Sequence, residues 1–203
     1  MSHAPPNQLT YVIGDNLYIN LNDRCTLECQ FCPKTHGIKR VHNYDLTLDH
    51  RPETEQIIAE IGDPSRYQQI VFCGFGEPTL RLKALLQIAR YVKEHGGSTR
   101  INTDGLANLF HKRNVLPEMA PWIDALSVSL NADSAALYQQ HCHPQLEGSY
   151  PAMLNFLREA PRYIPDVTAT AIDGLAGVDI AACEQIAHSL GVKFRRRYLD
   201  SLG

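Results

Sequence analysis

The sequence has no apolar run of the roughly 18–20 residues that a membrane-spanning helix needs, and no export signal at its start. We therefore expect a cytoplasmic protein without a membrane partner. A large excess of charge of one sign is also missing, since the sequence has 19 Lys and Arg and 22 Asp and Glu. A formal net charge of -3 gives no electrostatic case for binding nucleic acid.

Internal repeats and low-complexity segments are absent too, which argues against a second domain. An apolar content of 44% over 203 residues is enough for one substantial core. We expect residues 1–10 to be a disordered N-terminal lead and residues 11–203 to form a single domain.

Strand-like and helix-like segments alternate along this domain after a short hairpin. The hairpin pairs residues 11–13 with residues 17–22 across the turn Gly14-Asp15-Asn16. Further strands are predicted at 69–73, 99–103, 125–131, 167–172 and 192–199. Helices are predicted at 49–61, 79–95, 106–113, 134–140, 150–160 and 179–190. Such alternation predicts parallel strands joined by helical crossovers.

One face of the predicted strands is polar. Its residues alternate with apolar ones along the first and fourth barrel strands: Tyr18, Asn20, Asn22, Ser127, Ser129 and Asn131. A sheet covered by helices on both faces would be apolar on both, whereas a polar face suits strands that line a cavity. We therefore predict an α/β fold, a partial (β/α)6 TIM-type barrel with a short N-terminal hairpin extension. Its site should lie at the C-terminal ends of the strands.

Three of the six cysteines, Cys25, Cys29 and Cys32, fall in one short run directly after the first barrel strand. Because disulfides are rare in the cytoplasm, this run indicates a metal or redox site. Three thiolates at this spacing can converge on an iron–sulfur cluster and leave one iron open. A zinc site completed by His36 or His42, or a chance grouping, remains an alternative.

The run Cys25-x3-Cys29-x2-Cys32, with Phe31 before the third cysteine, resembles the signature loop of the radical S-adenosylmethionine (SAM) superfamily. The segment 74–78, Gly-Phe-Gly-Glu-Pro, follows the second strand and resembles the Gly-Gly-Glu-Pro segment of that family, although Phe75 interrupts the glycine pair. More narrowly, segments 17–21 and 191–195 resemble the TatD-associated branch, a likeness that implies no substrate.

The resemblance implies a [4Fe–4S] cluster held by the three cysteines, with SAM bound at its open iron. It implies that an electron from a donor such as flavodoxin or ferredoxin cleaves SAM to methionine and a 5′-deoxyadenosyl radical, which abstracts hydrogen from a substrate. Further SAM contacts are expected beside the adenine, in the glycine segment and at strand ends: Phe31, Gly74, Gly76, Glu77, Pro78, Asn102, Asp104, Ser127, Ser129 and Asn131. For the polar strand-end residues, capping of the strand is an equal alternative.

Arg195 and Arg197 share one face of the last predicted strand and are candidate catalytic residues that meet an anionic substrate or the SAM carboxylate. A solvated edge strand is the alternative. The chain stops soon after this strand, so we expect an open barrel side that a large substrate or a partner protein closes. Two other functions stay open: an activase that installs a radical on a partner protein, and a non-catalytic zinc-binding module.

Overall fold

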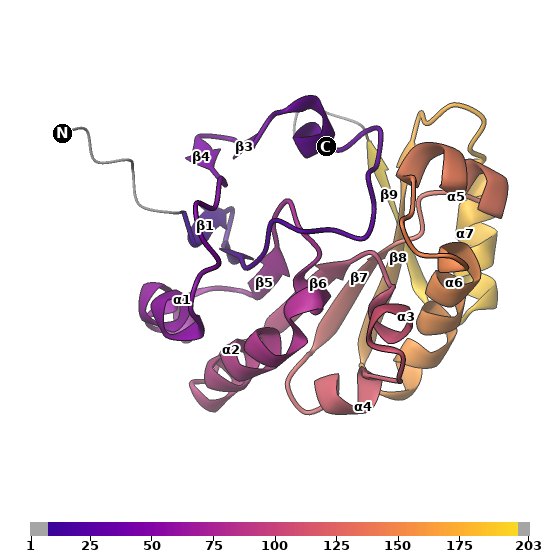
Figure 1. Ribbon diagram of the computed structural model, residues 1–203. Coiled ribbons are helices and arrows are strands. Elements are labelled where there is room, and N and C mark those ends of the chain that lie inside the picture. Colours follow the sequence, from indigo (N-terminus) through magenta and orange to yellow (C-terminus); the bar gives the residue numbers. More distant parts are fainter. Residues whose placement is uncertain (1–7, 199–203) are drawn as a thin grey trace.

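The computed structural model describes residues 8–198, and its centre is a single seven-stranded sheet (Figure 1). The strand order is β1-β2-β5-β6-β7-β8-β9. The hairpin strands β1 (Thr10–Ile13) and β2 (Asn16–Asn20) are antiparallel. From β2 onward the neighbours are parallel: β5 (Ile70–Cys73), β6 (Thr99–Thr103), β7 (Ala125–Ser129), β8 (Asp166–Asp173) and β9 (Lys193–Tyr198).

The two edge strands, β1 and β9, do not pair with each other in the described part of the chain, so the sheet is an open, partial barrel. The predicted six parallel strands and the N-terminal hairpin are confirmed. Residues 1–7 of the predicted disordered lead and the last residue of the predicted strand 192–199 lie outside the described residues.

Helices connect the parallel strands. They are α1 (Thr54–Ile61), α2 (Leu82–Glu94), α3 (Ala107–His111), α4 (Leu116–Met119), α5 (Ala135–Cys142), α6 (Ser149–Glu159) and α7 (Ile180–Ser189). Short 3-10 turns are η1 (Pro33–His36), η2 (Pro64–Arg66), η3 (Pro78–Arg81) and η4 (Ala160–Arg162). A small separate hairpin, β3 (Arg40–Val41) with β4 (Tyr44–Asp45), was not predicted, and neither was α4.

Two predicted boundaries are wrong for identifiable reasons. The first helix starts at Thr54 rather than at residue 49, because Pro52 disfavours helix in the residue before it. A capping box follows, in which the Gln56 side chain accepts from the Glu53 N–H at 3.0 Å. The fourth barrel strand ends at Ser129, since Asn131 has a φ of 58° that breaks the extended backbone.

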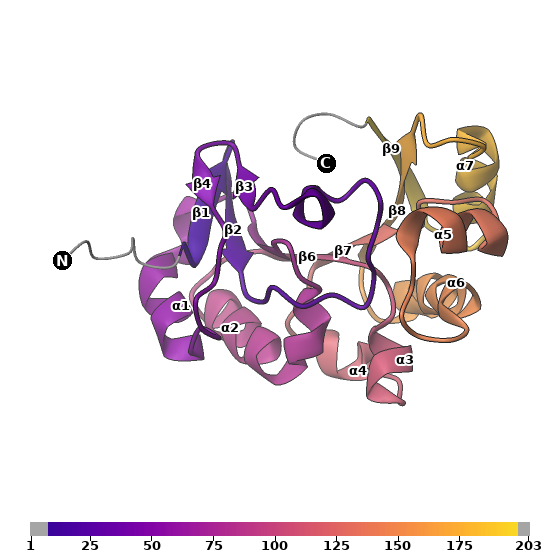
Figure 2. The ribbon, with the colours of Figure 1, turned by 45° about the horizontal axis from the view of Figure 1, so that its top comes forward.

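The two faces of the sheet differ as the sequence predicts. On the helix-covered face, Ile19, Phe72 and Ile101 are fully buried and belong to the main apolar core. On the other face, called the inner face below, the strand register aligns Asn20 with Cys73 and Asn102 with Ser127. In Figures 1 and 2 the helices lie outside the sheet, and the indigo-to-purple segment between β2 and α1 passes over the strand ends.

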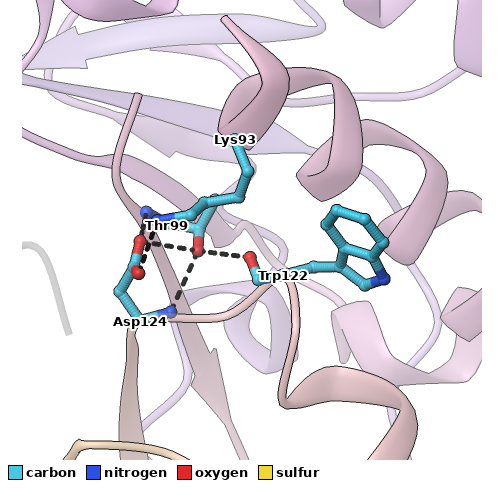
Figure 3. A network of polar contacts seen from close by, with 4 residues as sticks. All are labelled: Lys93, Thr99, Trp122 and Asp124. Carbon is cyan, nitrogen blue, oxygen red and sulfur yellow. Dashed lines mark hydrogen bonds and ion pairs between the residues drawn. The ribbon is translucent and has the colours of Figure 1, made fainter. Parts of the chain in front are cut away.

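The N-terminal ends of β6 and β7 are joined by a compact polar network (Figure 3). Asp124 accepts from the Lys93 ammonium at 2.6 Å and from the Thr99 N–H at 2.8 Å, while the Thr99 hydroxyl donates to the Trp122 carbonyl at 2.7 Å. Burial alone would raise the pKa of Asp124, but Lys93 and Thr99 outweigh it and lower that pKa. The network fixes the end of the sheet opposite the predicted site.

No helix in residues 8–198 is both long enough and apolar enough to cross a membrane.

Candidate functional site

The cysteine loop, defined as residues 21–32, runs directly from the C-terminal end of β2 to η1. Cys25, Cys29 and Cys32 are all half-buried free thiols. The end of the loop is a tight turn, in which the Cys32 N–H donates to the Cys29 carbonyl at 3.1 Å. The Thr35 hydroxyl donates to the same carbonyl at 2.9 Å. The structure therefore places the three predicted ligands on one loop at the predicted edge of the sheet.

The loop is held from one side by residues 141–145, which are the last two residues of α5 and the three residues after it. The Glu28 N–H of the cysteine loop donates to the Cys142 carbonyl at 3.0 Å, and the Gln30 N–H of the loop donates to the His141 carbonyl at 2.9 Å. The Gln145 N–H donates to the Thr26 carbonyl at 2.9 Å. These backbone bonds form a short antiparallel bridge, so two segments distant in sequence position the cysteines together.

Cys142 comes close to one of the predicted ligands. Its thiol hydrogen-bonds to Cys29, and this bond together with burial raises the pKa of Cys29. Burial, with the Asp104 and Glu77 carboxyls nearby, raises the pKa of Cys25 to about 12. Both thiols are therefore neutral in the chain without a metal ion, and a bound metal would have to displace their protons.

The three sulfurs affect one another electrostatically, but they do not converge on one point. Within residues 8–198, no three His, Cys, Asp or Glu side chains form a ready ligand set. His36 is turned to the Gln30 carbonyl, at 2.6 Å from its Nε2 atom, and the exposed His42 joins no such group. Metal binding therefore requires the loop to draw Cys25 toward the tight turn that already joins Cys29 and Cys32.

The glycine segment, residues 74–78, follows β5 and packs directly against the cysteine loop. The Glu77 N–H donates to the Arg24 carbonyl at 2.7 Å, and Asn22 donates through its amide to the Glu77 carbonyl at 3.1 Å. At Gly76 a Cβ atom would lie 2.1 Å from the Asn22 carbonyl oxygen, which no side chain can avoid. Glycine is thus required at Gly76 by backbone-to-backbone packing between the two segments.

Glu77 and Asp104 form a buried carboxyl pair behind the loop. Glu77 accepts four bonds: from the Thr79 N–H and hydroxyl, from the Thr103 hydroxyl, and from the Asp104 N–H. Asp104 accepts from the Thr26 hydroxyl of the cysteine loop and from the Leu106 N–H. Burial and the neighbouring Asp104 carboxyl raise the pKa of Glu77 to about 8, and burial raises that of Asp104.

Three asparagine amides near the strand ends have an oxygen that no donor reaches. The Asn20 amide donates to the Gln8 and Leu46 carbonyls, both at 3.0 Å, which leaves its Oδ1 atom without a partner. The Oδ1 atoms of Asn102 and Asn131 are also buried without a partner. A buried unpaired oxygen is costly, so these atoms suit a ligand that supplies N–H or O–H donors. The amino group and ribose of SAM are such donors, and three thiols on one loop are the ligand type of an iron–sulfur cluster.

The remaining predicted contacts are placed as follows. Phe31 is half-buried and packs against the apolar core, and Pro78 begins η3. Gly74 has a φ of 119°, and a Cβ there would lie 3.0 Å from the Asn20 Oδ1 atom. Ser129 ends β7, and Ser127 accepts from Arg195 on the inner face.

Sequence reasoning missed Arg100, the contact of Cys142 with Cys29 and the role of Thr26. Cys142 meets Cys29 only through the antiparallel bridge, and no local pattern reveals that contact. The alternation of Arg100 with Ile101 in β6 could have placed Arg100 on the inner face. Cys73 is half-buried on that face and accepts from the Asn102 amide at 3.4 Å.

Comparison with known proteins gives one family. The family model described as the radical SAM superfamily matches residues 19–190. A Methanocaldococcus jannaschii protein named as a glycyl-radical enzyme activating enzyme is 36% identical over 83 residues, which are 40% of this chain and 30% of that protein. A Pyrococcus furiosus protein named as a tungsten-containing aldehyde ferredoxin oxidoreductase cofactor-modifying protein is 31% identical over 91 residues, 44% of this chain and 23% of that protein.

These alignments span less than a third of the length of either curated relative. Among solved structures, Streptococcus suis SuiB bound to its precursor peptide SuiA superposes with a TM-score of 0.70 at 13% identity, covering 92% of this chain and 39% of that one. The likeness to SuiB is a likeness of fold.

Proposed function

The chain belongs to the radical SAM superfamily and is an enzyme of that family, and from this premise we propose that it holds a [4Fe–4S] cluster through Cys25, Cys29 and Cys32 and abstracts hydrogen from a substrate. When bound, the cluster and SAM supply the chemistry: one electron cleaves SAM to methionine and a 5′-deoxyadenosyl radical. The observation that carries the proposal is the cysteine loop itself, tied to the glycine segment at the C-terminal edge of the sheet.

The residues of the chain supply position and shielding. The glycine segment and residues 141–145 hold the loop from two sides, so its cysteines approach the strand ends in one orientation. The unpaired amide oxygens of Asn20, Asn102 and Asn131 accept donors of the bound SAM. Phe31, already packed against the core, covers the adenine side and limits water there.

The Glu77–Asp104 pair positions the cysteine loop and takes no part in the reaction itself. Glu77 is committed to four donors, two of them from β6 and its end, and Asp104 holds the loop through Thr26. The pair thereby joins the cysteine loop, the glycine segment and β6 into one unit. An external donor such as flavodoxin or ferredoxin completes the proposal, since the cleavage consumes one electron.

The test is anaerobic reconstitution with iron and sulfide, followed by SAM and dithionite. We expect cluster absorbance and 5′-deoxyadenosine in wild type, and neither in Cys29→Ala, with a loss of about 100-fold or more, as for removal of an essential group. The matched control is Cys183→Ala, which removes a buried thiol of α7 far from the loop and should keep both signals. Full product formation by Cys29→Ala would refute the cluster assignment.

A second candidate function is activation of a partner protein by installing a radical on it. It is favoured by the Methanocaldococcus jannaschii relative, whose name is that of a glycyl-radical enzyme activating enzyme. The two functions separate by electron paramagnetic resonance. A stoichiometric glycyl radical signal on a co-purified partner supports the activase, whereas hydrogen loss from a small molecule supports an enzyme acting on its own substrate. The family match sets aside the non-catalytic zinc module.

A further inference from the structure

Three arginines gather on the inner face of the sheet, and they come from two strands that do not adjoin. Arg100 lies in β6, whereas Arg195 and Arg197 lie in the edge strand β9. The register places Thr170 of β8 opposite both Ser129 and Arg195, so Arg195 is on the same face as the serines of β7. From there its guanidinium reaches back to Ser127, donating at 3.0 Å. Arg195 thus approaches Arg100 across β7.

The charges of Arg100 and Arg195 are not balanced by the protein. Among residues 8–198, no carboxylate forms an ion pair with either side chain. Both donate to neutral hydroxyls instead: Tyr18 accepts from Arg100 at 3.4 Å, and Ser127 accepts from Arg195. The Arg100 Nε atom is buried without any partner. Burial and the like charges of Arg100 and Arg197 lower the pKa of Arg195, so both neighbours repel Arg195.

Arg100 lies away from the cofactor edge, whereas Arg195 starts level with Ser129 at that edge and reaches down to Ser127. Arg100 is four residues before Asp104, which in an extended strand is a separation of about 13 Å. The cysteine loop and the glycine segment lie at the Asp104 end of the sheet. The SAM carboxylate, bound beside the loop, would therefore not reach Arg100, and a second molecule below the SAM site would.

We propose that Arg100 and Arg195 bind a compact oxyanion, a carboxylate or phosphate group carried by the substrate of this enzyme, while Arg197 lies nearer the cofactor edge on the same face. The planar guanidinium fork matches such an oxyanion with two parallel bonds, and an anion would cancel the repulsion within the cluster. The assignment rests on the proposed function, because it places the substrate on the inner face below SAM. In this arrangement the reacting C–H bond lies close to an acidic group of the substrate, and that group is bound at the level of Arg100 along the strands.

The experiment titrates the reconstituted holoenzyme calorimetrically at low ionic strength with inorganic phosphate in one arm and succinate in the other. We expect binding in at least one arm, and the stronger arm identifies the oxyanion. Arg195→Gln and Arg100→Gln should each weaken it by about tenfold or more, through loss of a charge-assisted bond. The matched control is Arg196→Gln, since Arg196 lies on the opposite face of β9 beside Asp173 and should leave the affinity unchanged.

Two readouts separate this role from others. Removing the charge that both neighbours repel should leave the melting temperature without anion equal to or above that of wild type, so a marked drop in Arg195→Gln would mean that Arg195 is structural. SAM affinity should change less than the affinity for phosphate or succinate; the reverse would assign the cluster to the SAM carboxylate. If 5′-deoxyadenosine forms but neither anion binds, the inference fails and the proposed function stands. If an anion binds without any SAM cleavage, the proposed function fails instead.

Discussion

Both ends of the sheet hold carboxyl groups in polar networks, half-buried at one end and buried at the other, and their surroundings are opposite. At the N-terminal end, Asp124 is matched by the Lys93 ammonium and the Thr99 N–H, and its pKa is lowered (Figure 3). At the C-terminal end, Glu77 and Asp104 lie side by side without a cation, and their pKa values are raised. The first arrangement stabilises the fold. The second costs stability and holds the cysteine loop in place, which is the division of roles seen in barrels of this type.

The largest difference in effect on product formation is expected between alanine substitutions of a glycine at each end of the sheet. In Gly76→Ala the new Cβ would meet the Asn22 and Arg24 carbonyls at 2.1 and 2.7 Å, so the loop must move. We expect 5′-deoxyadenosine formation to fall by about 100-fold or more, because a small misplacement of reacting groups has effects of this size. The measurement is product formation by the reconstituted variant.

The control for Gly76→Ala is Gly96→Ala, which lies after α2 with a φ of 77° and open space around its Cβ position. It should lose about 1 kcal/mol of stability from backbone strain alone and keep its product yield. Equal losses of product in both variants would show that glycine strain, rather than contact between the loop and the glycine segment, is responsible.

The second difference concerns pH. Because the pKa of Glu77 is about 8 in the folded chain against an ordinary value of 4.5, the folded chain keeps a proton that the unfolded chain releases between these values. The free energy of unfolding should therefore fall as pH rises from 5 to 8, by up to about 1.4 kcal/mol per pH unit for this group. Urea unfolding of the cluster-free chain measures the slope.

In Glu77→Gln the share of the slope due to Glu77 should disappear. The amide oxygen can still accept from Thr79 and Thr103, but the NH2 group then faces the Asp104 N–H, which loses its acceptor at a cost of about 1–3 kcal/mol. The matched control is Glu55→Gln in the exposed first turn of α1, which should keep the wild-type slope. An unchanged slope in Glu77→Gln would contradict the raised pKa.

The smallest of the three effects belongs to the N-terminal end. Asp124→Asn removes the ion pair with Lys93 at 2.6 Å, and we expect a loss of about 1–2 kcal/mol at pH 7. The sign of the pH dependence is opposite to that of Glu77: the contribution of Asp124 is complete above its unfolded pKa of 3.8 and is lost as pH falls through its lower folded pKa. Thermal melts from pH 7 to pH 3 measure it.

Product formation by Asp124→Asn should equal that of wild type, since the network is at the far end of the strands from the loop. Glu94→Gln, which breaks the exposed pair with Arg90, should cost only about 0.3–0.5 kcal/mol and serves as the control for a surface ion pair. A lower product yield in Asp124→Asn would show that the two ends are coupled.

Local patterns were enough to predict the fold and the position of the cysteine loop. Alternating strands such as 99–103 report which face is buried, and the cysteine spacing is itself a short-range feature. Boundaries were less accurate where a single residue decides them: Pro52 delays α1, and the left-handed Asn131 ends β7 early.

Contacts between distant segments could not be predicted in this way. The hydrogen bond between Cys29 and Cys142 depends on how residues 26–30 lie along residues 141–145, and no spacing within either segment specifies that pairing. The arginine cluster likewise needs the register of β7, β8 and β9 before Arg195 can be placed near Arg100. Assignment of the cysteines to the cluster remains a prediction until the reconstitution is done.

The antiparallel bridge between the cysteine loop and residues 141–145 also has a consequence during synthesis of the chain. A ribosome makes the cysteines first, and the segment that braces their loop follows roughly 110 residues later, on the order of ten seconds at usual elongation rates. Throughout that interval the three thiols of the nascent chain lack this cover. Insertion of iron into an ordered loop must therefore wait until most of the barrel has been translated.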